Sequence, residues 1–240
     1  MTDAGYCTVD DVRRTLQEAS FSGPLEEDDN QAVVDAITAQ SEWLQERTNR
    51  HWYEPDADDL RYDAPLEHTE TLDVPAGPHP DHTHTFRGGG QNRQPRYPKR
   101  FGGPYTRVRL TRRDVQEVTE LLVRDSSGDV EDWIGEKDEG RGEAYYLTQP
   151  TDTGFARLYL HTGDLPRLRD YSAAVNVTYE YGVDSITGTV RDAIAMRAAA
   201  KLVIDDEASI GIPDNAQLVN VETKAQQWRD AAAELLEVHL

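Results

Sequence analysis

The spacing of the apolar residues changes twice along this chain, and that change limits the folds it can adopt. Near both ends, apolar residues recur every three or four positions, as on a helix with one buried face. From about residue 60 to 182 they occur in short β-branched and aromatic runs separated by Gly, Pro and Asp, which is typical of strands. The sequence therefore predicts an α+β fold, in which N- and C-terminal helices pack as a bundle with an inserted antiparallel β region.

Four helices are expected. The first begins with Thr8 and Asp11 as an N-cap pair, and the second begins after Asp28 or Asp29 and runs to about Asn49. The third is the alanine-rich stretch at 189–206. The last helix places one apolar stripe along its side, made of Val221, Ala225, Trp228, Ala232 and Leu235. That stripe must be covered, either by the chain's own helices or by a partner protein.

The expected domain boundaries follow from the same pattern: N-terminal helices in 1–55, the β insertion in 56–182, and C-terminal helices in 183–240 that complete the bundle with 1–55. Residues from about 75 to 113 are predicted to form a long basic loop, since Gly and Pro disfavour regular structure through most of 87–104. The candidate strands lie at 60–63, 70–74, 83–87, 106–110, 115–125, 143–148, 155–161 and 173–182.

Charge is distributed very unevenly. The formal net charge is −20, yet residues 87–113 contain nine Lys and Arg and no acid, which leaves −29 on the remaining 213 residues. Lysine is scarce, with 4 Lys against 21 Arg, while Asp and Glu total 45. A surface of carboxylates stays hydrated when salt screens ordinary electrostatics, so this composition favours a protein from a salt-loving microbe.

Several function classes find no support in the sequence. There is no apolar run of about 18 residues and no signal-peptide pattern, so we expect a protein made in the cytoplasm with no membrane partner. The single cysteine, Cys7, excludes an intramolecular disulfide and a multi-cysteine zinc site. Phosphate-binding, dinucleotide-binding and nucleophile-elbow motifs do not occur, so no cofactor and no catalytic residue is predicted.

One histidine-rich segment carries the alternative of an enzyme. His79, Asp81, His82 and His84 lie within six residues, and alternation on a strand would place His82 and His84 on one face. The neighbouring prolines and glycines instead indicate a solvated loop, so no metal site is predicted. A small metal-dependent enzyme using this cluster is the alternative function, together with a monomeric binding module.

The basic stretch has three interpretations. It is a solvated loop, or it docks on an acidic surface such as another copy of this chain, or it contacts phosphates of nucleic acid without reading bases. Tyr97, Phe101 and Tyr105 are interspersed among its cations. The candidate DNA- or neighbour-facing residues are Arg87, Arg93, Arg96, Lys99, Arg100 and Arg107.

Two segments resemble a known family. "AITAQSEWLQERTNRHWYEP" (36–55) is similar to a helix of the head–tail connector (adaptor) proteins of tailed phages, which ends in an Arg-aromatic segment. "VNVTYEYGVDSITGTVRDAIAMRAAAKLV" (175–203) resembles the final strand, Tyr-Gly turn and Ala-rich helix of that family. The order agrees from about residue 8 to 205. The sequence departs in the longer, more basic segment at 75–113 and in Thr187-Gly188-Thr189, where the family usually has a proline.

The resemblance implies a structural virion protein. Such adaptors form a ring, typically of twelve copies, between the portal protein and a tail-side neck or tail protein, and they continue the channel for double-stranded DNA. It implies a location in the virion neck and a C-terminal region that docks on the portal, which makes the stripe from Val221 to Leu235 a possible portal contact. With the acidic composition, it suggests a tailed virus of a halophilic archaeon. Twelve basic stretches would place roughly a hundred positive charges around one ring.

Overall fold

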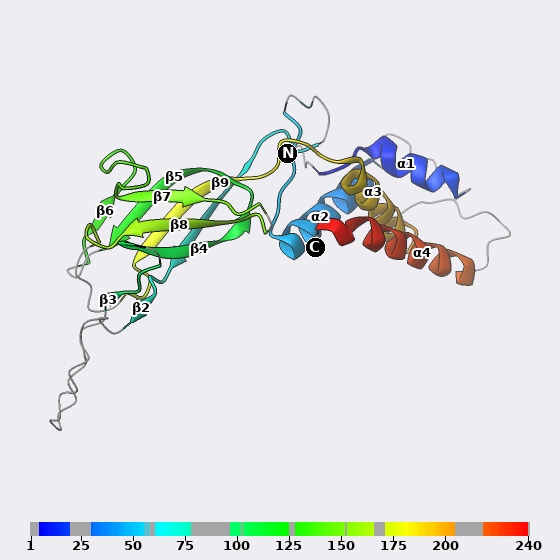
Figure 1. Cartoon of the computed structure of the whole chain (residues 1–240). Helices are drawn as coiled ribbons and strands as arrows, with labels where there is room; N and C mark the ends of the chain where they lie inside the picture. Colours follow the sequence, from blue (N-terminus) through cyan, green and yellow to red (C-terminus); the bar gives the residue numbers. More distant parts are fainter. Residues whose placement is uncertain are drawn as a thin grey trace, which may run out of the picture. The chain divides into compact units, whose positions relative to one another are not determined.

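The computed structural model describes residues 5–19, 30–55, 57, 61–77, 97–101, 103–124, 128–151, 153–165, 171–204 and 218–239. The chain divides into two compact units (Figure 1). The helical unit comprises Met1–Pro65 and Gly182–Leu240, and the β unit comprises Leu66–Tyr181. The predicted α+β fold, with an antiparallel β region inserted between helices from both ends of the chain, is confirmed.

The first helix, α1 (Val9–Glu18), begins where the sequence predicts. Thr8 accepts a hydrogen bond from the Asp11 backbone N–H, and the Asp11 carboxylate accepts one from the Thr8 backbone N–H at 3.0 Å. This reciprocal capping box satisfies two N–H groups that a helix start leaves without partners. Val12 and Leu16, one turn apart, are then buried on the inner face of the helix.

The alanine-rich helix α3 (Gly188–Leu202) lies at the centre of the helical unit. Thr187 caps it through its side-chain oxygen, which accepts from the Val190 N–H, so this threonine begins the helix where the resemblance leads one to expect a proline. Five of its alanines are buried: Ala193, Ala195, Ala198, Ala199 and Ala200. Side chains this small let neighbouring helices approach closely.

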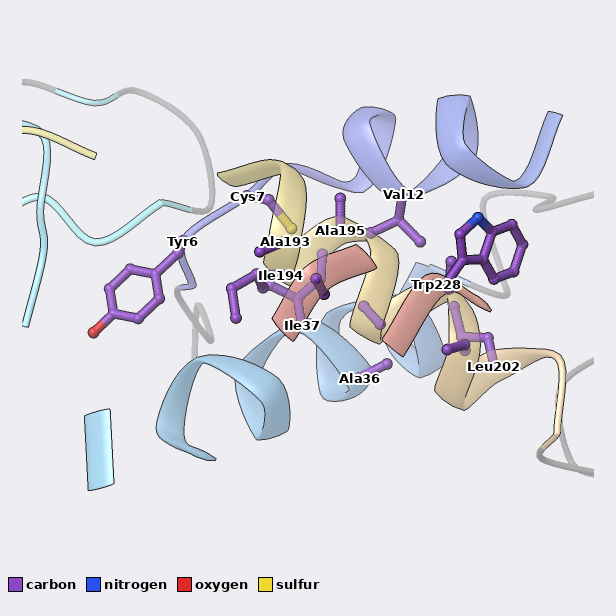
Figure 2. Close-up of a cluster of buried hydrophobic side chains, with 14 of the residues drawn as sticks. Tyr6, Cys7, Val12, Ala36, Ile37, Ala193, Ile194, Ala195, Leu202 and Trp228 are labelled. Atoms are coloured by element: carbon purple, nitrogen blue, oxygen red, sulfur yellow. The ribbon is translucent and has the colours of Figure 1, made fainter. Parts of the chain in front are cut away.

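The three other helices pack against α3. α1 contacts it, as do α2 (Asn30–Thr48) and α4 (Leu218–Leu236), which is followed by a short 3-10 turn at Glu237–His239. Figure 2 shows side chains from all four helices, among them Val12, Ile37, Ile194 and Trp228, in one buried cluster. None of the helices in the described part of the chain combines the length and apolar character that a membrane span requires.

Backbone hydrogen bonds of His51 and Tyr53 to Val183 join the two chain segments of the helical unit. The Val183 N–H donates to the His51 carbonyl, and the Tyr53 N–H donates to the Val183 carbonyl, each at 3.0 Å. Gly182, which directly precedes Val183, has a φ of +148°, and a Cβ atom at this position would lie 3.0 Å from His51 Cδ2. The Tyr-Gly pair seen in the sequence therefore favours glycine, because this backbone conformation is strained for other residues and a side chain would press on the His51 ring.

The His51 ring is fully buried and its hydrogen bonds fix its tautomer. Nε2 lies 3.0 Å from the Ala64 carbonyl oxygen, which only accepts, so Nε2 carries the proton. Nδ1 then accepts from the Tyr6 hydroxyl at 3.0 Å. Desolvation by burial lowers the pKa of His51 to about 4, so the imidazole is neutral in the folded protein.

The β unit consists of two antiparallel sheets. The first has the strand order β1-β9-β5-β6, with β1 at Leu66–Leu72, β9 at Val175–Tyr181, β5 at Val115–Arg124 and β6 at Val130–Asp132. The second has the order β4-β8-β7, with β4 at Tyr105–Arg113, β8 at Phe155–His161 and β7 at Tyr145–Thr148 (Figure 1). A separate strand pair joins β2 (Ala76–Gly77) to β3 (Tyr97–Pro98).

One apolar core lies between the two sheets. Val108 and Leu110 of β4 and Leu158 and Leu160 of β8 are buried with residues of the other sheet, among them Val177 of β9. Because successive side chains of a strand point to opposite faces, the residues between these apolar positions lie on the outer faces of the sheets.

The β region differs from the sequence predictions in two places, and a third prediction lies outside the described residues. Residues 61–63 form no strand, and the β pairing there is limited to an isolated bridge between Arg61 and Gly5. The predicted strand at 83–87 lies outside the described residues. The expected end of the basic loop at about residue 113 was wrong, because Tyr105–Arg113 forms β4, and this strand confirms the candidate strand at 106–110. Arg107 is therefore held on a paired strand.

Candidate interaction surface

The outer face of the sheet β4-β8-β7 gathers arginines and aromatic rings. Arg107 of β4 lies opposite Tyr159 of β8, and Arg109 lies opposite Arg157. On the next strand, Tyr146 of β7 lies opposite Tyr159. We call this surface the cationic face and define it by Lys99, Phe101, Arg107, Arg109, Arg141, Tyr146, Phe155, Arg157 and Tyr159.

Aromatic rings hold the cations of this face in place. The Arg107 guanidinium lies 4.5 Å from the centre of the Phe101 ring, and Lys99 Nζ lies 5.1 Å from the same ring. Arg109 lies 4.0 Å from the centre of Phe155. At exposed sites each such contact contributes about 0.5–1 kcal/mol and does not neutralise the charge. The guanidinium groups are therefore ordered but keep their positive charge for a partner.

Two tyrosines extend the face towards β7. The rings of Tyr146 and Tyr159 are stacked with centres 4.6 Å apart, and the Arg141 guanidinium lies 5.8 Å from the Tyr146 ring. Tyr105 closes the end of this row: it meets Tyr146 edge-on, donates to the Glu143 carbonyl at 2.9 Å and accepts from the Gly142 N–H at 2.7 Å. Arg and Tyr are residue types that contribute much of the energy in protein interfaces.

The cations of this face have no carboxylate partner within the described part of the chain. The ion pairs there involve other residues, and none includes Arg107, Arg109 or Arg157. Arg109 and Arg157 even lie directly opposite each other on neighbouring strands, an arrangement of like charges that destabilises a sheet. An external anionic group would therefore stabilise the cationic face.

The structure describes only part of the predicted basic site. Arg87, Arg93 and Arg96 lie outside the described residues, whereas Lys99, Arg100 and Arg107 lie within them, with Lys99 and Arg100 exposed. Sequence reasoning missed Arg157, Tyr146 and Tyr159, because they are distant in sequence and adjacent only through strand pairing. The alternation in "FARLYLH" was the signal: it places Arg157 and Tyr159 on the face opposite Leu158.

The apolar stripe of α4 lies inside the helical unit. Val221, Ala225, Trp228 and Ala232 are buried in the core of the unit, and Leu235 packs against it. The stripe was expected to be covered by the chain's own helices or by a partner protein, and the chain's own helices cover it. A contact between α4 and a portal protein stays a prediction, and it would have to use the exposed side of the helix, which carries residues such as Glu222 and Asp230.

The described residues offer few groups that could bind a metal ion or act as a nucleophile. No group of three His, Cys, Asp or Glu is close enough there to hold a metal ion, and the cluster from His79 to His84 lies outside them. Cys7 is buried, and burial together with the carboxylate of Asp11 raises the pKa of its thiol. A thiol without access to solvent and held in its protonated form is a poor nucleophile.

Comparison with known proteins gives only distant similarities. No protein-family model and no curated protein matches the chain. Among solved structures, it is similar to a chain in the neck of an empty gene transfer agent particle with C6 symmetry, at 14% identity and a TM-score of 0.42, covering 83% of this chain and 78% of that one.

Two further chains are similar at the same level. One belongs to the virion of the native gene transfer agent particle, at 14% identity and a TM-score of 0.40, covering 83% of this chain and 77% of that one. The other belongs to the neck of the native particle with C12 symmetry, at 14% identity and a TM-score of 0.40, covering 82% and 81%. Similarities this distant do not assign a function to the chain.

Proposed function

We propose that this chain is a structural virion protein, a head–tail adaptor whose copies form a ring between the portal and the tail and continue the DNA channel. The observation that carries the proposal is the order of the elements. Helices α1 and α2 precede the β unit and α3 and α4 follow it, and all four share one core. This is the organisation that the resemblance to phage head–tail connectors implies.

The segments with the resemblance fold as that family leads one to expect. Residues 36–55 supply most of α2 and then the aromatic segment with Trp52 and Tyr53. Residues 175–203 supply β9, the Gly182 turn and α3. The proposal also agrees with the source of the distantly similar chains, although a likeness at that level does not carry it.

The role is architectural, with no catalytic step. In the ring, the basic stretch faces passing DNA or a neighbouring protein with Arg87, Arg93, Arg96, Lys99, Arg100 and Arg107. Contacts to phosphates alone suit a conduit that must pass any sequence. The portal lies on one side of the ring and a tail-side neck or tail protein on the other. The particle is that of a tailed virus of a salt-loving archaeon, since the carboxylate excess repels itself where salt does not screen it.

Native mass measurement and electron microscopy of the purified chain in molar potassium chloride test this proposal. We expect closed rings of one copy number, typically twelve, that bind a portal assembly. A chain that stays monomeric at every salt concentration and ignores the portal would contradict the adaptor function and support the binding-module alternative. One bound metal ion per chain, lost together with a hydrolytic activity on His82→Ala and His84→Ala substitution, would support the enzyme alternative.

A further inference from the structure

The outer face of the other sheet has the opposite charge. On the side away from the core, Glu67 of β1 and Glu117 of β5 both lie opposite Glu180 of β9. Glu120 of β5 lies opposite Thr178 on the same side and accepts a hydrogen bond from its hydroxyl at 3.0 Å. We call these four glutamates the acidic face. Arg124 at the end of β5 is the only cation on this side of these three strands.

Three of these carboxylates form one row across three strands. Glu180 is paired with Glu67 on one side and with Glu117 on the other, and Glu67 and Glu117 are exposed. Like charges directly opposite each other destabilise a sheet. No cation of the described residues forms an ion pair with any of the three. The chain thus keeps a repulsive row at the centre of a sheet face.

The cationic face repeats this arrangement with the opposite sign. Arg109 and Arg157 are directly opposite each other, Arg107 is one pair further along, and these arginines have no acidic partner in the part of the chain that the structure describes. Each face is therefore repulsive within its own copy. Each offers the charges that would relieve the repulsion on the other.

We propose that the cationic face of one copy docks on the acidic face of the next copy. This inference deepens the proposed ring and rests on it. The two faces belong to different sheets of the β unit, so one copy uses them for two different neighbours. A contact between two unlike surfaces is heterologous, and repetition of such a contact closes into a ring where the rotation permits it. The stacked Tyr146 and Tyr159 supply aromatic contact area beside the charges.

The acidic row favours a second copy over DNA as the occupant. Phosphates would neutralise Arg107, Arg109 and Arg157, but they would leave Glu67, Glu117 and Glu180 repelling one another. A second copy neutralises both faces at once. Charges that pair directly in a contact are screened by salt much less than separated surface charges, so the contact is compatible with a saline environment.

Charge reversal on each face tests the inference. The first variant carries Arg107→Glu, Arg109→Glu and Arg157→Glu, so that both faces are negative. The second carries Glu67→Arg, Glu117→Arg and Glu180→Arg, so that both faces are positive. We expect each variant alone to lose the ring in native mass measurements and an equimolar mixture to regain it with the two chains alternating. A single chain with all six substitutions should again form rings alone.

The controls separate the possible failures. Glu136→Arg, Asp138→Arg and Glu139→Arg change the charge as much as the second variant, outside both faces, and should leave the ring intact. Circular dichroism establishes that each variant is folded. Rings formed by either triple variant alone, or a mixture that stays dissociated, would overturn face pairing while the ring of the unaltered chain keeps the proposed function.

The unaltered chain and DNA binding complete the test. If the unaltered chain forms no ring, both the proposed function and face pairing fail. If the first variant keeps its ring but loses affinity for a double-stranded DNA fragment, the cationic face is a DNA surface and the docking proposal is wrong.

Discussion

The helical unit and the β unit use their charged and apolar residues in different ways. In the helical unit, the apolar stripes of four helices meet in one core around the alanines of α3, and two ion pairs of α1 join neighbouring turns of that helix. In the β unit, the core is also apolar, but each outer sheet face holds like charges directly opposite one another. The helical unit covers its apolar stripes with its own helices, whereas the outer sheet faces of the β unit present rows of like charge that another molecule would neutralise.

The largest expected effect comes from the β core. Leu158 is fully buried between the sheets, so Leu158→Ala should destabilise the β unit by about 2–5 kcal/mol. Hydrogen exchange read separately for each unit checks this, with faster exchange expected in β4, β8 and β7 and little change in α3. Val130→Ala, at a side chain with 52% exposure, is the matched control and should change little. Equal loss of protection in both units would show that they unfold together.

His51 should make the stability of the helical unit depend on pH. The pKa of His51 is about 4 in the folded state and about 6.5 when unfolded, so the unfolded state binds more protons between these values. Stability is therefore full above about pH 6.5 and is lost as the pH falls towards 4, by up to about 3 kcal/mol.

Thermal unfolding followed from pH 7 to 4.5 checks this, with the His51→Gln variant expected to be less stable at pH 7 but to show a shallower decline. His239, where burial also lowers the pKa, provides the comparison: His239→Gln should keep most of the slope of the unaltered chain. An unchanged slope in His51→Gln would contradict the assignment.

Much of the helical unit was predictable because its signals are local. The Thr8–Asp11 pair, the start of α3 and the buried stripe of α4 each depend on residues within a few turns of one another. The β unit is harder because its contacts are distant in sequence. Two irregularities in the pairing of β5 with β9, near Gln116 and Thr119, shift the alternation so that Glu117 and Glu120 both face outwards. Strict alternation from Val115 would have placed them on opposite faces.

The capping box of α1 gives an intermediate effect in the helical unit. Thr8→Ala removes the oxygen that accepts from the Asp11 N–H and should lower the stability of this unit by about 1 kcal/mol. Thr8→Ser keeps the acceptor and should behave almost like the unaltered chain. Denaturant unfolding of the two variants measures the difference, and equal losses would mean that the threonine methyl group, not the cap, matters.

The smallest effect is the one that distinguishes the two units most clearly. Glu180 has a glutamate opposite it on each side, so Glu180→Gln removes two repulsive pairs and should raise the stability of the isolated chain by about 0.2–1 kcal/mol. The same substitution removes a charge from the acidic face and should weaken ring formation. The control is Asp230→Gln, a neutral replacement on the exposed side of the helical unit, which also removes a hydrogen bond from Gln226. It should not raise the stability of the chain while weakening ring formation. Denaturant unfolding of dissociated chains and sedimentation of the rings give the two quantities. If Glu180→Gln lowered the stability of the isolated chain, the row would be stabilised by contacts within the copy, and no second copy would be needed to neutralise it.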